Sequence, residues 1–166
     1  MRLSDEARKY LGQREISGNS GFIDPAFEAE MKEEGWQKGW AWCCVVARLW
    51  AVNCWPDKAD NIRKLFSPSV IQTYRNFRDT AYVSREIPQV DGLVFYQSYK
   101  DGSPKETGHI GVISSVDLNG RRYMDISGNT NEAGSREGIL VGEKSHSFEN
   151  TKVDNGLRRI GIFKVA

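Results

Sequence analysis

The chain has 166 residues, of which 39% are hydrophobic, and it carries 23 basic and 22 acidic side chains for a net charge of +1. A chain of this length buries most of its surface without disulfide or metal staples, so we expect one domain over residues 1–166. The balanced charge gives no sign of the basic excess that binding to nucleic acids or anionic membranes normally needs, and we expect no nucleic-acid partner.

The first part of the chain has helical patterns. Ser4, followed by two acidic residues, is typical of a helix start and predicts a short helix that ends near Leu11. The Asp-Pro pair at 24–25 predicts a second helix that ends before Gly35, because proline suits the first helical position. The polar segment 12–21 is expected to connect these two helices.

A third helix is predicted from Trp42 to about Asn53, because apolar side chains recur there at helical spacing. Two further helical patterns follow, in residues 58–66 and, after Pro68, in residues 69–82. The side chains of the third helix that fall on one stripe are Cys43, Val46, Ala47, Trp50 and Ala51.

After Pro88 the pattern changes to that of β-strands. Helices followed by strands are typical of the α+β class, so we expect N-terminal helices packed on a C-terminal antiparallel β-sheet. The segments predicted as strands are 92–97, 109–116, 121–127, 138–143 and 157–165.

The sequence contains no apolar run near 18 residues, and its first 13 residues lack the apolar centre of a signal peptide. We therefore expect synthesis in the cytoplasm without a signal peptide and no insertion into a membrane. Three cysteines, two of them adjacent, do not make a disulfide framework, and the chain has only two histidines. We expect no metal site and no cofactor.

Cys43 falls on the first turn of the predicted third helix. Unpaired N–H groups and the helix macrodipole stabilise an anion there, so the thiolate becomes a usable nucleophile. Trp40 and Trp42 are candidates for the walls of a substrate cleft around it. Cys44 and Cys54 are predicted to be small apolar core side chains, and inert core packing is also the alternative interpretation of Cys43.

A cysteine nucleophile needs a base, and the two histidines differ in context. His146 lies in the polar segment 143–150, which we interpret as a surface loop. His109 opens a strand between Gly108 and Gly111, which leave space beside the imidazole for another backbone or a substrate. We predict that His109 is the base, the alternative being a strand-edge histidine with one ordinary hydrogen bond.

The turn after the His109 strand predicts which residue orients the imidazole. A three-residue loop over residues 118–120, with Gly120 in the left-handed conformation, sets the pairing of the two strands. A two-residue loop would shift the pairing by one and move Asn129 to the face away from His109. With the three-residue loop the facing pairs are His109 with Asn129, Gly111 with Ser127, and Ile113 with Asp125.

In these features the chain resembles the CHAP domains, which are cysteine, histidine-dependent amidohydrolases/peptidases, and related papain-like peptidoglycan hydrolases of phage endolysins and bacterial cell-wall enzymes. The resemblance covers most of the chain, and its Trp-Cys and Gly-His-Ile-Gly-Val elements, in that order, are fairly specific together. The segments that carry it are 7–19, 42–43, 88–96, 108–113 and 126–131.

The resemblance implies a thiolate at Cys43, a general base at His109 and a polar residue that orients the base, for which Asn129 is the best candidate. Relatives often have Glu where this chain has Ser127, and they usually have Pro-Gly-Asp at 90–92, where this chain reads Val-Asp-Gly. Ser127 and Asp125 therefore stay open as alternatives for the orienting residue, and Ser127 also as a substrate-binding residue.

Gln37 is a further substrate-binding candidate, because its position six residues before Cys43 matches the spacing of the papain oxyanion glutamine. An ordinary solvated glutamine is the alternative interpretation.

The resemblance also implies a papain-like fold and a monomeric, cysteine-dependent peptidoglycan hydrolase without metal or cofactor. Such an enzyme, an amidase or endopeptidase, would cleave a cell-wall amide through a Cys43 thioester, as a phage endolysin or wall-degrading effector without a separate wall-binding domain. Delivery to the wall would occur by release at phage lysis, by injection from a virion or by contact-dependent secretion. Two alternatives stay open: a non-catalytic wall-binding or virion structural module, and a cysteine protease or deamidase that acts on proteins.

Overall fold

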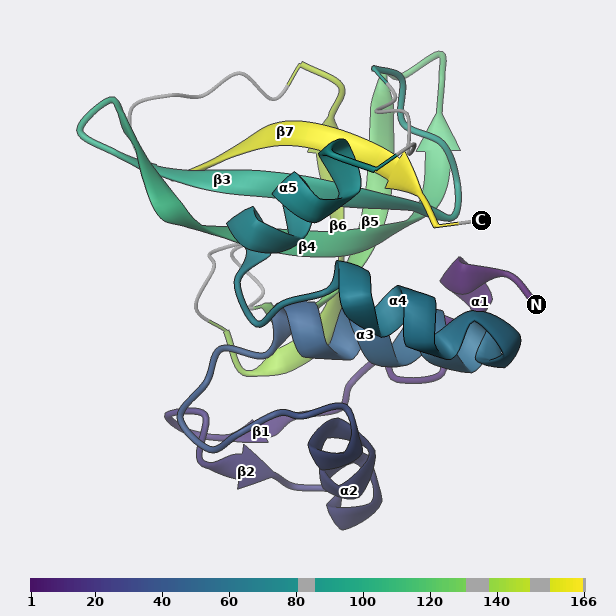
Figure 1. Cartoon of the computed structure of the whole chain (residues 1–166). Coiled ribbons are helices and arrows are strands. Elements are labelled where there is room, and N and C mark those ends of the chain that lie inside the picture. Colours follow the sequence, from purple (N-terminus) through teal and green to yellow (C-terminus); the bar gives the residue numbers. More distant parts are fainter. Residues whose placement is uncertain (81–85, 131–137, 150–155, 166) are drawn as a thin grey trace.

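The computed structural model describes residues 1–80, 86–130, 138–149 and 156–165. N-terminal helices pack against a C-terminal five-strand antiparallel sheet, which confirms the predicted α+β class (Figure 1). The helices are α1 (Leu3–Arg8), α2 (Pro25–Glu33), α3 (Cys43–Cys54), the 3-10 helix η1 (Pro56–Lys58), α4 (Ala59–Leu65) and α5 (Val70–Arg78).

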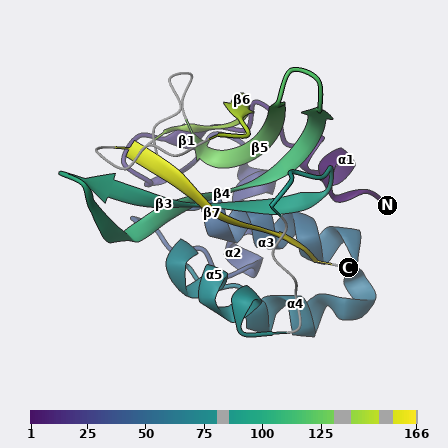
Figure 2. The same ribbon diagram turned by 90° about the horizontal axis from the view of Figure 1, so that it is seen from above.

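The large sheet has the strand order β6-β5-β4-β3-β7, and neighbouring strands are antiparallel. Helix α3 contacts β4 and β5, and α5 contacts β3 and β4, so the helices cover one side of the sheet (Figure 2). The strands of this sheet are β3 (Gly92–Lys100), β4 (Ser103–Asp117), β5 (Arg122–Thr130), β6 (Leu140–Ser147) and β7 (Gly156–Lys164).

A second, two-strand sheet lies in the segment 12–21 and just beyond it, which we had expected to be a polar connection. Its strands are β1 (Glu15–Ile16) and β2 (Gly21–Phe22), and Figure 1 shows them with α2 at the end of the molecule away from the large sheet. Glu15 is buried and accepts a hydrogen bond from the indole N–H of Trp42. The prediction missed this hairpin because its strands are too short to show an alternating pattern.

The two predicted helix starts at Ser4 and at 24–25 have different outcomes. The Asp24 carboxylate accepts hydrogen bonds from the N–H groups at Ala26 and Phe27, which confirms it as the cap of α2. Ser4 does not cap α1, because its N–H and its hydroxyl both donate to the Asp91 carboxylate. Helix α1 also ends at Arg8 rather than near residue 11.

Helix α3 begins one residue later than predicted, with Trp42 as its N-cap. The predicted stripe is buried, but so are most of the other side chains of this helix. A helix that is apolar all round is buried on all sides, and α3 lies between α1, α2, α4 and the sheet. The central position of α3 fixes its N-terminus firmly against β4 and β5. The buried residues of α3 are Cys43, Cys44, Val45, Val46, Ala47, Leu49, Trp50, Ala51, Val52 and Cys54.

The hairpin between β4 and β5 differs from the prediction in two places. Strand pairing ends at Asp117 opposite Arg122, so the loop has one residue more than predicted, and its left-handed residue is Arg121 instead of Gly120. A bulge between residues 113 and 115 shifts the register back by one. The predicted pair of Ile113 with Asp125 is therefore confirmed, although the predicted loop is wrong.

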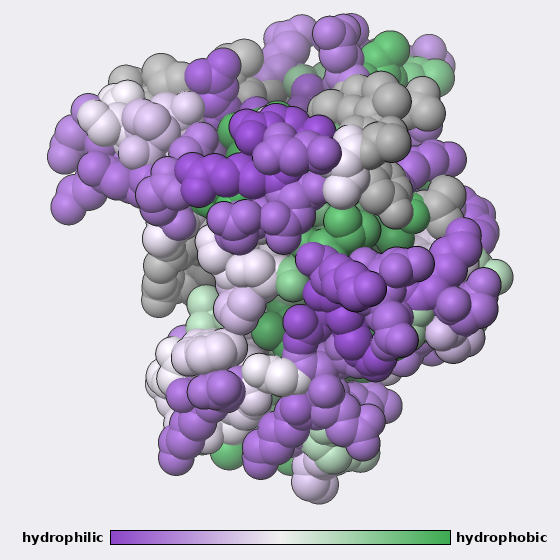
Figure 3. Space-filling model, in the orientation of Figure 1, coloured by the Kyte–Doolittle hydropathy of each residue, from purple (hydrophilic) through white to green (hydrophobic). Residues whose placement is uncertain are grey.

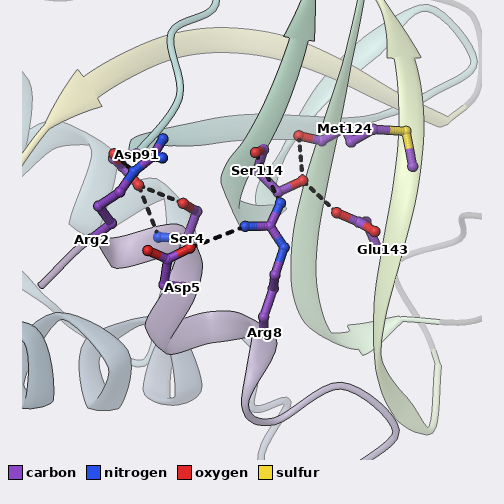
Figure 4. Close-up of polar contacts among 8 residues, drawn as sticks. All are labelled: Arg2, Ser4, Asp5, Arg8, Asp91, Ser114, Met124 and Glu143. Atoms are coloured by element: carbon purple, nitrogen blue, oxygen red, sulfur yellow. Dashed lines mark hydrogen bonds and ion pairs between the residues drawn. The ribbon is translucent and has the colours of Figure 1, made fainter.

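Side chains from two distant elements hold this bulge at Ser114 (Figure 4). Arg8 of α1 donates to the Ser114 carbonyl oxygen, 3.1 Å away. The Ser114 hydroxyl lies within hydrogen-bond distance of the Glu143 carboxylate in β6 and of the Met124 carbonyl oxygen in β5. The register of β4 on β5 thus depends on the N-terminal helix as well as on the turn.

The surface in the orientation of Figure 3 is mainly hydrophilic, with hydrophobic residues visible in the middle, between the sheet above and the helices below. No helix in the described part of the chain is both long and apolar enough to cross a membrane.

Candidate active site

A pocket of about 380 Å³ opens at the N-terminus of α3. Its volume lies within the range of small-molecule sites, about 300 to 1,000 Å³. The loop before α3, the start of α5, and strands β4 and β5 all contribute to its walls. The lining residues are Trp40, Ala41, Cys43, Pro68, Ser69, Val70, Glu106, Thr107, Gly108 and Asn129.

Cys43 is the first residue of α3 and lines this pocket, with 4% of its surface exposed. The pKa of its thiol lies well below the ordinary value. The main cause is a hydrogen bond from the Cys44 thiol, and a hydrogen bond and positive charge from the His109 imidazole add to it, while burial opposes the shift. The Cys44 backbone N–H also stabilises the thiolate, as expected at a helix N-terminus. The site therefore favours a nucleophilic thiolate at Cys43.

The neighbouring Cys44 has the opposite character. Burial, and then the adjacent Cys43 sulfur, raise the pKa of the Cys44 thiol well above its ordinary value. Its Sγ lies 3.6 Å from the Thr73 hydroxyl and is not among the atoms that line the pocket. Cys54 is buried as well, and burial raises the pKa of its thiol. The prediction that Cys44 and Cys54 are core side chains is confirmed.

His109 lies in β4 opposite Tyr96 of β3, and 5% of its surface is exposed. Its Nδ1 atom is buried and forms no well-aligned hydrogen bond with any described residue. Buried ring nitrogens normally have a hydrogen-bond partner. A catalytic base can be an exception, because it must be free to exchange a proton with a thiol and a substrate. The arrangement brings the predicted nucleophile and the predicted base together.

The glycines beside His109 have the predicted function of leaving space. A Cβ atom at Gly108 would lie 2.1 Å from the Tyr96 carbonyl oxygen, so only glycine permits this approach of β3. A Cβ atom at Gly111 would lie 2.9 Å from the Asp125 carboxyl carbon. The backbone of β3 fills the space at Gly108, and the Asp125 carboxylate fills the space at Gly111.

Asn129 lines the pocket together with Cys43 and has 4% of its surface exposed. The ladder between β4 and β5 ends at Val112 opposite Ile126, still in the predicted register, so the predicted pairs of His109 with Asn129 and of residues 111 with 127 lie beyond it. Asn129 has a φ of 54°, and this left-handed conformation turns the chain out of the regular strand. No hydrogen bond joins Asn129 to His109 among the described residues, and an orienting role for Asn129 stays a prediction.

The two tryptophans that precede Cys43 have different positions. Trp40 is 37% exposed and lines the pocket, as predicted for a cleft wall. Trp42 is fully buried, packs edge-on against Phe22, and donates to Glu15 at 2.6 Å. The prediction of Trp42 as a cleft wall is wrong, because its ring fills the core space beside Gly128, where a Cβ atom would lie 2.5 Å from it.

Two other predicted substrate-binding residues do not reach the pocket. Gln37 is exposed in the turn that precedes Trp40 and does not line the pocket. Ser127 is 1% exposed, pairs with Gly142 of β6, and does not line it either. Neither residue is therefore part of the pocket wall.

The pocket also contains residues that the sequence analysis did not single out. Ser69 and Val70 form the start of α5, and Glu106 and Thr107 belong to β4, which begins six residues before His109. Glu106 and Thr107 could have been predicted as site residues from their closeness to His109 in the sequence. They were missed because their polar character is not typical of a strand.

His146 lies in β6 and not in a surface loop, so that prediction is wrong. Its ring contacts those of Tyr96 and Tyr123, at centroid distances of 5.3 and 5.2 Å. Its Nε2 atom is 3.2 Å from Asp125 Oδ2, an oxygen that also accepts a hydrogen bond of 2.6 Å from the Tyr96 hydroxyl. Burial and the Asp125 charge raise the pKa of Tyr96 well above its ordinary value. Asp125 is thus bound by these neighbours.

The described residues contain no group of three or more His, Cys, Asp or Glu side chains that could hold a metal ion. Comparison with protein-family models, curated proteins and solved structures gave no match for this chain. The assignment of a function therefore depends on the chemistry of the pocket.

Proposed function

We propose that the protein is a cysteine-dependent peptidoglycan hydrolase with a CHAP-like, papain-related fold, which cleaves a cell-wall amide through a thioester on Cys43. The observation that carries this proposal is the thiol of lowered pKa at the N-terminus of α3, next to His109 and open to a pocket. The resemblance of the sequence to CHAP domains supports peptidoglycan as the substrate.

The reaction follows from the pairing of the Cys43 thiol with the His109 imidazole. The Cys43 thiolate attacks the amide carbonyl carbon, and the His109 imidazolium gives its proton to the departing amine. A water molecule then attacks the thioester carbonyl carbon while His109 takes its proton. The acyl group leaves as the acid, and the Cys43 thiolate is regenerated. Cys43 is the first residue of α3, so its backbone N–H has no partner within the helix and would be available to bind the oxyanion.

The pocket walls suit an amide of a peptide. Trp40, Pro68 and Val70 provide apolar surface, while the polar side chains of Ser69, Thr107 and Asn129 can bind backbone groups of the substrate. A thiol of lowered pKa has no advantage in a purely structural module, which argues against the non-catalytic alternative.

The test is the release of soluble fragments from purified peptidoglycan sacculi. The wild-type protein is expected to release fragments, and Cys43→Ala is expected to release none while it unfolds at the same temperature. Mass spectrometry of the fragments separates cleavage between sugar and peptide from cleavage within the stem peptide. Intact sacculi after treatment with folded wild-type protein would contradict the proposal, and cleavage of proteins such as casein under the same conditions would favour a protein substrate.

A further inference from the structure

We propose, building on the function proposed above, that Glu106 binds an ammonium group of the substrate, so that the pocket selects peptides with a free amine near the cleaved amide. Glu106 is then a specificity-determining residue. The substrate class is a short peptide with either a free amino terminus or a diamino-acid side chain.

The charge of the pocket lining is the first argument. Among the described residues that line the pocket, Glu106 has the only carboxylate, and none has a cationic side chain. Apart from the Cys43 thiolate, the other lining side chains are apolar or neutral, so no second carboxylate in the lining competes for a cation.

The present partner of Glu106 leaves room for a ligand. Arg75 of α5 binds the two carboxylate oxygens through one nitrogen, at 3.0 and 2.9 Å. Both side chains are exposed, Arg75 by 41% and Glu106 by 71%, and such ion pairs contribute only about 0–1 kcal/mol. A carboxylate has about four acceptor positions, so an ammonium group can bind Glu106 beside Arg75 or replace it.

Glu106 also lies near the reacting groups in the chain. It precedes His109 by three residues on β4, at the irregularity between Pro104 and Gly108, so the two Cα atoms lie at most about 10 Å apart. A bound ammonium would thus lie within roughly three extended peptide residues of the attacked carbonyl. Trp40 lines the same pocket, and an aromatic face attracts an ammonium group within about 6 Å of its centroid.

The test compares sacculi in their natural form with sacculi whose free amines have been acetylated. Acetylation is expected to lower kcat/KM of the wild-type protein about tenfold, as is Glu106→Gln on untreated sacculi. The two changes should not add, because both remove the same contact. Arg75→Gln is the matched control and should retain discrimination between the two substrates. Muropeptides acetylated only at the amino terminus or only at the diamino acid then identify the amine.

The outcomes separate this proposal from the proposed function. Hydrolysis of both kinds of sacculi at equal rates by the wild-type protein, or an undiminished preference in Glu106→Gln, would overturn the role of Glu106 and leave the hydrolase function intact. No hydrolysis of either kind would overturn both. Thermal unfolding and the rate of Cys43 alkylation should be unchanged in Glu106→Gln, which excludes a general structural effect.

Discussion

Arg8 in α1 donates a hydrogen bond to the backbone carbonyl of Ser114, 106 residues further along the chain and in the bulge of β4. This contact joins the N-terminal helix to the point at which the register of β4 on β5 changes. The same bulge decides which β5 side chains face the strand that carries His109. The geometry of the site thus depends on a contact between β4 and a helix outside the β4–β5 hairpin.

The first prediction concerns this bulge. Ser114→Ala removes the hydroxyl that bonds to Met124 and Glu143, and it should lower the free energy of unfolding by about 1 kcal/mol. Urea unfolding followed by tryptophan fluorescence measures the change. Asp5→Ala is the control, since Asp5 contacts Arg8 only on the exposed surface and should have little effect. Equal effects of the two variants would contradict a special role for the bulge.

The second prediction concerns the two adjacent thiols. Cys43→Ala should abolish hydrolysis and rapid alkylation by iodoacetamide, whereas Cys44→Ala should keep most of the hydrolysis. Because the Cys44 thiol lowers the pKa of Cys43, its removal should raise that pKa and move the acid limb of the pH–rate profile to higher pH. The measurement is the alkylation rate between about pH 4 and 9, a range that spans the ordinary cysteine pKa.

Cys54→Ala is the matched control for this series, because Cys54 lies at the far end of α3 and its Sγ contacts the Met1 carbonyl. Its pH profile should match that of the wild type. Full hydrolysis by Cys43→Ala, or the same loss in Cys43→Ala and Cys44→Ala, would show that the nucleophile is misassigned.

The third prediction concerns Asn129, whose side chain lines the pocket and whose backbone is left-handed. Asn129→Gly removes the side chain and suits the backbone, and it should lower turnover about tenfold to a thousandfold without loss of stability. Asn129→Ala should lose turnover as well and about 1 kcal/mol of stability, because alanine is strained at this φ. Steady-state kinetics and thermal unfolding measure the two effects.

Asp125→Ala serves as a comparison, since Asp125 was one alternative for the orienting residue. The Asp125 carboxylate accepts a hydrogen bond from the buried Tyr96 hydroxyl and lies 3.2 Å from His146 Nε2. This variant should therefore be less stable by about 1–3 kcal/mol and should lose less turnover than Asn129→Gly. A stable Asp125→Ala variant with greater loss of turnover than Asn129→Gly would reverse the assignment.

The fourth prediction concerns pH and Asp91, which has a φ of 68°. Burial raises the pKa of this carboxyl, but hydrogen bonds from Ser4 and the charge of Arg2 outweigh it, so the pKa is lowered on balance. A lowered folded-state pKa means that the contacts stabilise the protein above the unfolded value of about 3.9, and that this contribution is lost as the pH falls through the lower folded value.

Asp91→Gly tests this, because glycine suits the backbone and removes only the carboxylate. The difference in unfolding free energy between the wild type and this variant should be largest near pH 7 and should shrink below about pH 4. Urea unfolding at several pH values measures it. A difference that stays constant down to pH 2 would mean that the carboxylate charge does not contribute.

The sequence by itself determined those features that depend on near neighbours. The apolar stripe of α3 and the proline after Asp24 fix helices through contacts within one or two turns, and alternation fixes strands. Cys43 at a helix start and His109 between glycines were identified for the same reason. The order of helices and strands was sufficient for the α+β class.

The tertiary structure decided what depends on residues far apart in the chain. Trp42 points into the core because its indole N–H donates to Glu15 and its ring fills the space beside Gly128. His146 is in a strand because Tyr96 and Tyr123 pack against its ring there. These partners all lie more than 20 residues away in the sequence, so the local pattern around Trp42 and His146 does not contain them. Arg8 stabilises the bulge that corrects the register of β4, through a hydrogen bond between residues 106 positions apart in the chain. Such a contact contributes energy only once the helices and the sheet have assembled.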